Sequence, residues 1–313
     1  MYYFKLIHIK LLTGCMGLMI MEAHAQNLKT IRSGEGIEIL ENGKKVLFYQ
    51  HRPKSLSGKY ERAGYVHPLY SLNEKILTEA FPEDHPYHHG IFWAWHQILL
   101  NDKSIADGWI CENISWNPTK LKVKKKKGKV ILQSELNWSV KRAQNNPTNI
   151  VKEDTRITVY KSAEKYRVID FDIQLTALAD SLKIGGSDDV KGYGGFCLRL
   201  RLPNDISFVS DDTAVNPMEK AVTAGPWMNF TGSFDGSAMP KAGIAVFCSQ
   251  TADRKQNWIL RKEKSMQNVP YPGRTPILLS KKGWRLKYRI IIHNGQLSSG
   301  ELEELYQQYI RKS

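Results

Sequence analysis

The chain has 313 residues, of which 42% are hydrophobic and 24% are charged. This balance is typical of a globular protein and excludes both a disordered chain and a protein built from membrane spans. The 45 lysines and arginines outnumber the 31 aspartates and glutamates, giving a formal net charge of +14. No helix-turn-helix pattern, zinc-knuckle spacing or ribonucleoprotein motif accompanies the charge, so nucleic acid is not an expected partner.

The N-terminal stretch predicts an export signal. A basic start precedes a short apolar run, residues 11–21, and Ala23-His24-Ala25 has the small-x-small pattern of a signal peptidase site. The run is too short to span a bilayer, and no later segment is long enough either. We therefore expect a signal peptide at 1–25 and a mature protein of residues 26–313, periplasmic or secreted. The tetrapeptide that ends at Cys15 resembles a lipoprotein acylation box, so an anchor on Cys15 is the minor alternative.

Most of the mature chain alternates apolar and polar residues in short runs, the period of β-strands with one wet face. Gly36–Leu40 and Val46–Gln50 flank Asn42-Gly43, a dipeptide that favours a tight hairpin turn. The lysine-rich residues 122–129 predict an exposed turn and a charged edge that discourages sheet-to-sheet association, with attraction to acidic glycans as the alternative. Further predicted strands are Val130–Val140, Asp154–Tyr160, Tyr166–Leu175, Phe196–Leu202, Ile244–Phe247, Pro276–Leu279 and Leu286–His293.

Only the C-terminal end predicts a long helix, Ser299–Ile310. Ser298 and Glu301 form a capping box, and apolar residues recur on one face after it. The strand density and the lack of a linker predict an all-β fold: one large, single antiparallel β-sandwich followed by this helix. The Gly- and Asp-rich segment 180–195 is expected to be a long loop over a site.

One segment, Phe81–His96, concentrates the reactive side chains. Imidazole exchanges protons near neutral pH, and indole rings stack on the apolar face of a sugar. The segment therefore predicts a carbohydrate site, whereas the alternative is a core strand preceded by a loop whose imidazoles make structural hydrogen bonds. Four of the seven histidines after residue 25 lie in the segment, and four tryptophans lie in or just after it: His85, His88, His89 and His96, with Trp93, Trp95, Trp109 and Trp116.

We expect the candidate groups to meet on one concave face of the sandwich. The candidate catalytic residues are His85, His88, His96, His293 and, as the carboxylate, Glu112. The candidate substrate-binding residues are Arg62, His89, Trp93, Trp95, Tyr193, Arg199 and Trp227. Structural ion pairs are the alternative for the two arginines.

No cofactor or metal is expected. A divalent metal on His85 and His88 is the alternative, but Pro86 opposes a helical presentation of this pair, and no HExxH spacing occurs. Motifs of activated serine hydrolases and nucleotide enzymes are also missing. Cys111, Cys197 and Cys248 follow residue 25, an odd number that does not suit a disulfide framework.

Several blocks resemble the bacterial PmoA-like family over nearly the whole mature chain. They are Arg62–Tyr70, Leu77–Trp95, Gly192–Phe196 with Arg199, Pro226-Trp227 and Tyr288–His293. The resemblance implies a sandwich similar to galactose mutarotases, a fold that also holds sugar epimerases, polysaccharide lyases and glycosidase domains. His85 and His88 match the family pattern, whereas His89 stands at a position where the family has arginine. The family is named after a multi-span methane oxygenase subunit, an activity not expected here.

Two classes of function follow from these patterns. The first is an exported enzyme that acts on a carbohydrate, acidic carbohydrates included, by imidazole and carboxylate proton transfer, like an epimerase, lyase or glycosidase. The second is a non-catalytic glycan-binding or accessory module, which needs aromatic rings and arginines but no titrating pair.

Overall fold

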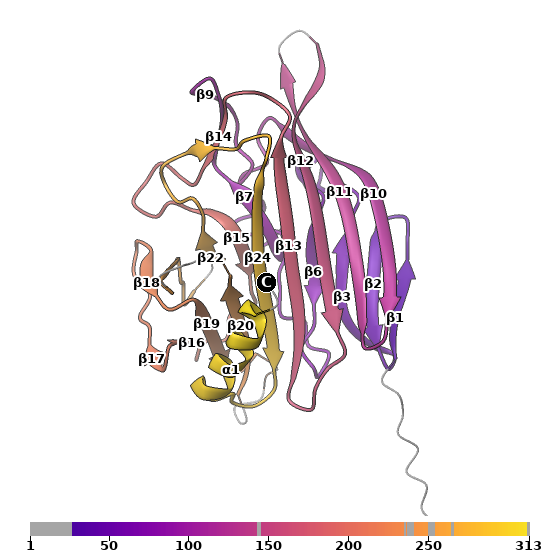
Figure 1. The fold of residues 1–313 in the computed structure, drawn as a ribbon, viewed down its shortest axis with the longest axis vertical. Coiled ribbons are helices and arrows are strands. Elements are labelled where there is room, and N and C mark those ends of the chain that lie inside the picture. Colours follow the sequence, from indigo (N-terminus) through magenta and orange to yellow (C-terminus); the bar gives the residue numbers. More distant parts are fainter. Residues whose placement is uncertain are drawn as a thin grey trace, which may run out of the picture.

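The computed structural model describes residues 27–311, apart from 143–144, 235, 237–240, 250–253 and 264–265. The predicted signal peptide, with Cys15, lies outside the described residues. Two large antiparallel sheets pack face to face, and one helix covers part of the outer face of the larger sheet (Figure 1). The predicted all-β sandwich is therefore confirmed.

The smaller of the two main sheets has seven strands. Asn42 and Gly43 have φ angles of 53° and 84° and close the hairpin between its second and third strands, as the dipeptide predicts. In spatial order the strands are β1 (Leu28–Arg32), β2 (Gly36–Glu41), β3 (Lys44–Gln50), β6 (Tyr65–Leu69), β7 (Ile91–Trp95), β15 (Gly194–Arg199) and β22 (Met266–Pro270).

The larger sheet has nine strands. Lys122 and Lys124 lie within its edge strand β10, and the turn that follows is at Gly128, so the lysines border the sheet along a strand as well as in the turn. In spatial order the strands are β10 (Ile114–Lys126), β11 (Lys129–Arg142), β12 (Asn145–Tyr160), β13 (Tyr166–Ala177), β24 (Trp284–His293), β20 (Ala242–Cys248), β19 (Trp227–Gly232), β16 (Ser207–Ser210) and β17 (Thr213–Ala214).

Three small sheets lie outside the two main sheets. The segment predicted as a continuous loop over 180–195 contains β14, so the loop itself is residues 186–193, between β14 and β15. The small sheets are β23 (Ile277–Leu278), β14 (Leu182–Gly185), β8 (Gln97–Leu100) and β9 (Lys103–Ala106); β18 (Val222–Ala224) and β21 (Gln256–Trp258); and β4 (Lys54–Leu56) and β5 (Lys59–Arg62).

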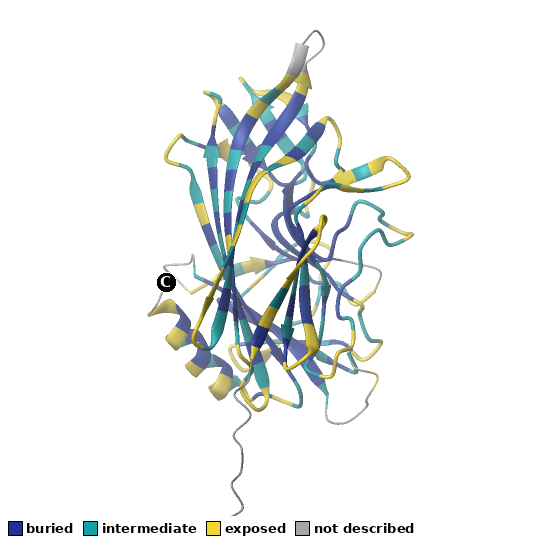
Figure 2. Ribbon diagram, turned by 90° about the vertical axis from the view of Figure 1, so that its right-hand side faces the viewer, coloured by how far each residue is buried: buried dark blue, intermediate teal, exposed yellow. Residues whose placement is uncertain are grey.

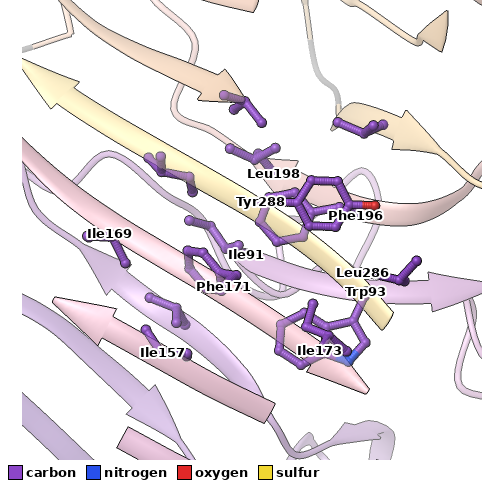
Figure 3. Packing of buried hydrophobic residues seen from close by; sticks show 14 of the residues in the cluster. Ile91, Trp93, Ile157, Ile169, Phe171, Ile173, Phe196, Leu198, Leu286 and Tyr288 are labelled. Atoms are coloured by element: carbon purple, nitrogen blue, oxygen red, sulfur yellow. The ribbon is translucent and has the colours of Figure 1, made fainter. Parts of the chain in front are cut away.

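The hydrophobic core lies between the two main sheets. Along β13 buried and half-buried residues alternate, as the period-2 sequence pattern predicts, and Figure 2 shows the same alternation along the neighbouring long strands. Across the interface, Phe196 of β15 stacks on Tyr288 of β24 with ring centroids 4.2 Å apart (Figure 3). Such contacts join the sheets into one packed interior.

The helix α1 (Ser299–Ile310) begins at the predicted residue. Ser298 and Glu301 form the reciprocal capping box, and Leu302, Leu305 and Tyr306 are buried against β20 and β24. No helix among the described residues is long and apolar enough to cross a membrane.

Candidate functional site

The candidate site lies on the outer face of the seven-stranded sheet, over β7 and β15. In β7 the side chains alternate, so that Ile91, Trp93 and Trp95 enter the core while Phe92 and Ala94 face outward. The outward residues form a small apolar cluster with Cys197 and Met266 of the neighbouring strands and with Trp109. This buried cluster forms the floor of the site, and loops from distant parts of the chain pack above it.

A cleft of about 430 Å³ opens above this floor, and we call it the histidine cleft. Three of the predicted imidazoles and Tyr193 meet there, although they come from three separate segments of the chain. The lining residues are His85, Tyr87, His88, His96, Trp109, Ser187, Asp189, Lys191, Tyr193, Arg261, Glu263 and Met266.

The first imidazole, His85, is held by a carboxylate. Its Nδ1 lies 2.9 Å from Oδ2 of Asp84, and Oδ1 of the same carboxylate accepts a hydrogen bond of 2.7 Å from Arg199. Arg199 also donates to Glu79 at 2.9 Å, so the buried guanidinium fixes the loop. Partial burial acts to raise the pKa of Asp84, but the hydrogen bonds from His85 and Arg199 outweigh it and lower the pKa. Asp84 is therefore an anion that orients His85.

The second imidazole, His88, is buried and neutral. Its ring stacks on His85 with centroids 4.9 Å apart and meets the ring of Trp109 edge to face at 5.7 Å. Burial, together with the positive charge of Arg199, lowers the pKa of His88 to about 2. Its Nε2 is buried and has no hydrogen-bond partner among the described residues, an arrangement that costs free energy.

The third imidazole, His96, is held by a second carboxylate. Its Nδ1 lies 2.8 Å from Oδ2 of Asp107, and its ring stacks on Trp109 at 5.2 Å. The other oxygen of Asp107 accepts the backbone N–H groups of Trp109 and Ile110, which builds the tight turn that presents Trp109. Because Nδ1 is bound to Asp107, Nε2 is the nitrogen left for chemistry in the cleft.

The loop 186–193 supplies the opposite wall. Burial acts to raise the pKa of Asp189, but hydrogen bonds from Ser187 and from the backbone of Gly192 and Lys191 lower it. The ring of Tyr193 lies 5.2 Å from that of Trp109, and the guanidinium of Arg261 lies 5.5 Å over Tyr193. The cleft therefore combines aromatic rings with fixed charges of both signs.

The prediction that His293 shares this cleft is wrong. His293 lies on the outer face of the other sheet, on the same side of β24 as Ile291, which packs beneath α1. Its ring nitrogens lie 2.8 Å from the carbonyl oxygen of Gly295 and 2.9 Å from Oδ1 of Asn229. The imidazole is thus a fully buried structural group.

The predicted tryptophan platform is also wrong. Trp93 and Trp95 point into the core, where Trp95 donates to the carbonyl oxygen of Tyr271, and Figure 3 shows Trp93 beside Ile173 between the sheets. Trp227 lies beneath α1 and donates to Glu303. The rings that reach the cleft are those of Trp109, Tyr87 and Tyr193 instead.

Arg62 and His89 are buried beside the site and do not line the cleft. The guanidinium of Arg62 lies 3.9 Å over the ring of Trp116 and donates to the carbonyl oxygens of Trp93 and Gly108, so it supports the Trp109 turn from below without an ion pair. His89 is enclosed by aromatic rings, and burial lowers its pKa well below the ordinary value. Neither side chain can bind substrate directly.

Glu112 lines a neighbouring hollow, described below, and not the histidine cleft. Its backbone pairs with Asp107 to close the Trp109 turn, which carries the side chain past the cleft wall. Among the described residues no group of three His, Cys, Asp or Glu side chains is placed to hold a metal ion, and Cys111, Cys197 and Cys248 are unpaired.

Sequence reasoning missed the two carboxylates that hold the imidazoles. Asp84 directly precedes His85, and this adjacency was a usable signal. Asp107 lies eleven positions after His96, and only the pairing of β8 with β9 brings the two together. Tyr87, Asp189, Lys191 and Arg261 also belong to the cleft without having been predicted.

Comparisons with known proteins place the chain in a family. No curated protein matches it. Residues 36–307 match the model of a family of unknown function, DUF6807, and this match contains both main sheets almost entirely and most of α1. The chain therefore belongs to the DUF6807 family.

Proposed function

We propose that the protein is a carbohydrate-active enzyme that moves protons on a sugar bound in the histidine cleft. The observation that carries the proposal is the pair of Asp-held imidazoles, His85 with Asp84 and His96 with Asp107, lining one cleft. A carboxylate on Nδ1 fixes the tautomer and stabilises the imidazolium that forms when Nε2 accepts a proton.

The reaction class that fits this pair is isomerisation of a sugar by acid and base acting together. One imidazole takes a proton from a hydroxyl or a carbon of the substrate, and the other gives a proton to an oxygen elsewhere on the ring. For ring opening of a hemiacetal, the anomeric hydroxyl loses its proton, the bond to the ring oxygen breaks, and that oxygen gains a proton. The exchange is balanced and needs no cofactor.

The walls of the cleft suit a sugar better than a flat apolar ligand. Tyr87 and Tyr193 can present rings to the C–H face of a pyranose, while Asp189 and Lys191 can meet its hydroxyl groups. The resemblance to the PmoA-like family and to mutarotase-like sandwiches supports the same substrate class by analogy.

A binding module is less consistent with this geometry. Glycan-binding platforms need an exposed aromatic face, but Trp109 is 3% exposed and is covered by His96 and His88. The contacts of Trp109 position His96, one of the proposed catalytic imidazoles, and the buried His88, and this arrangement favours catalysis.

We also propose that the protein is exported. The support is the sequence of residues 1–25, with its short apolar run and its Ala23-His24-Ala25 site. An anchor on Cys15 is the alternative form of the same proposal.

The test is a screen of the mature protein against aldoses, keto-sugars and uronates in D₂O, followed by NMR. We expect faster exchange between anomers or epimers, or deuterium at a substrate carbon. His96→Ala and Asp107→Asn should each lower kcat by about 10²–10⁴-fold. His51→Ala is the matched control, since His51 contacts Ser134 away from the cleft and should leave kcat unchanged. Equal rates in all variants would show that the imidazoles of the cleft are not catalytic.

A further inference from the structure

A second hollow adjoins the histidine cleft. It measures about 650 Å³ and includes Tyr60, Glu61, Glu112 and Lys141 among its lining residues. Tyr87 lines both the hollow and the cleft, so the two spaces meet at this ring. Both volumes fall in the range of roughly 300–1,000 Å³ that is common for small-ligand sites, so each can hold a sugar unit.

Two tyrosines form an aromatic wall where the hollow meets the cleft. The rings of Tyr60 and Tyr87 have centroids 6.0 Å apart and are tilted by 58°. Both side chains are part-exposed, unlike Trp93, Trp95 and Trp227, which were predicted to bind substrate but are buried. A part-exposed tyrosine ring can cover the C–H face of a pyranose while its hydroxyl stays in water.

Polar groups for the sugar hydroxyls surround these rings. Glu61, Glu112 and Lys141 are exposed, and no described side chain pairs with them. Tyr60 has a φ of 55°, in the left-handed region, so the β4–β5 hairpin holds it in a conformation that a tyrosine seldom adopts. The hollow thus has aromatic rings and available hydrogen-bonding groups, and the histidine cleft has both as well.

We propose that this hollow is a second sugar subsite and that the substrate is an oligosaccharide of at least two linked units. One unit occupies the histidine cleft, the next occupies the hollow, and the linkage passes Tyr87. The inference rests on the proposed function, since it assigns a neighbour to the sugar in the cleft. It also gives Glu112 a role in the second subsite, where its carboxylate accepts hydrogen bonds from the hydroxyl groups of the sugar.

A third hollow, on another side of the histidine cleft, serves as a comparison. It shares Lys191 and Arg261 with the cleft, but no aromatic ring lines it. Arg261 donates there to the backbone carbonyls of Met218 and Glu219, so its guanidinium is already engaged. Met218, which is 51% exposed, therefore provides a matched control position.

Calorimetric titration tests the proposal. The probes are galactose, glucose, xylose and galacturonic acid, each with its 1,4-linked disaccharide. We expect one disaccharide to bind at least tenfold more tightly than its monosaccharide. Tyr60→Ala and Glu112→Gln should reduce this gain while leaving the Kd of the monosaccharide within twofold. Tyr60→Phe and Met218→Ala should keep the gain, and thermal melting checks that each variant is folded.

The outcomes separate this inference from the proposed function. Equal Kd values for monosaccharide and disaccharide, or a gain that survives Tyr60→Ala, would overturn the subsite and leave the histidine cleft in place. Binding of no saccharide at all would overturn both. Loss of the gain in Met218→Ala but not in Tyr60→Ala would place the second unit in the other hollow and contradict the proposal.

Discussion

Burial divides the four histidines of residues 85–96, which lie on either side of β7, into two kinds. His88 and His89 are nearly or wholly hidden, and burial is the first cause that lowers the pKa of each. His85 and His96 are partly exposed, and each has a carboxylate on its Nδ1. Since the residue type is the same, only the surroundings decide which imidazole is buried and neutral and which is partly exposed and held by a carboxylate.

The neutral state of His88 predicts a change in acid stability. The folded pKa of about 2 lies below the ordinary value of 6.5, so between these values the unfolded chain binds a proton that the folded chain does not. Stability due to His88 is therefore present above pH 6.5 and is lost as the pH falls, by about 1.4 kcal/mol per pH unit. We expect the difference in unfolding free energy between the wild type and His88→Gln to narrow by about 2 kcal/mol from pH 7 to pH 5.

Denaturant titrations at the two pH values measure this difference. Trp109→Phe, beside His88, removes no imidazole and should show the same difference at both pH values. A difference for His88→Gln that also stays constant would mean that the folded protein protonates His88 as readily as the unfolded chain does.

At the scale of elements, the conformation of Gly90, directly before β7, decides where the loop of residues 81–90 lies. Gly90 has a φ of 69°, and a Cβ atom there would lie 2.3 Å from the carbonyl oxygen of Val66 in β6. Only glycine combines this backbone conformation with such a close approach. The residues just before Gly90 can therefore turn back over the sheet and carry His85 and His88 above it.

We expect Gly90→Ala to destabilise the protein by about 3 kcal/mol or more, because the left-handed backbone and the clash both cost free energy. Gly128→Ala is the control: its φ is 72°, but the nearest atom to an added Cβ is Lys161 Cδ at 4.0 Å. It should lose only about 1–2 kcal/mol. Chemical denaturation measures both, and equal losses would show that the approach to Val66 does not constrain the loop.

The sequence offered β7 only as the core strand of the alternative interpretation of Phe81–His96, and it did not predict the direction of its side chains. Ile91–Trp95 are all apolar and all buried, since one face meets the core and the other meets the Trp109 cluster. A period-2 pattern has no polar residue here to mark the outer face, so Trp93 and Trp95 were placed in the site instead of the core. By contrast, β13 alternates regularly, and its start and its alternation were predicted correctly, although the strand continues two residues beyond the predicted end, to Ala177.

At the scale of the whole molecule, local patterns predicted the strands and long-range pairing decided the site. The all-β sandwich and α1 follow from periodicity and capping, which are local properties. The position of β15 between β7 and β22, and of β24 between β13 and β20, depends on partners far away in the chain. His293 was misplaced for that reason, because its strand belongs to the sheet that does not carry the cleft.

The interlocking of the two sheets predicts one cooperative unfolding transition. Phe196 is fully buried between Tyr288 and Phe171 of the opposite sheet, with ring centroids at 4.2 and 5.3 Å. Phe196→Ala should therefore destabilise both sheets together by about 3–5 kcal/mol. Phe48→Ala changes a half-buried residue of the same sheet and should cost much less, because that ring keeps contact with water in the folded state.

Calorimetry and far-ultraviolet circular dichroism should show a single transition, displaced to lower temperature in Phe196→Ala. Two separate transitions in the variant would show instead that each sheet is stable without the other, and that the floor of the histidine cleft does not depend on the nine-stranded sheet behind it.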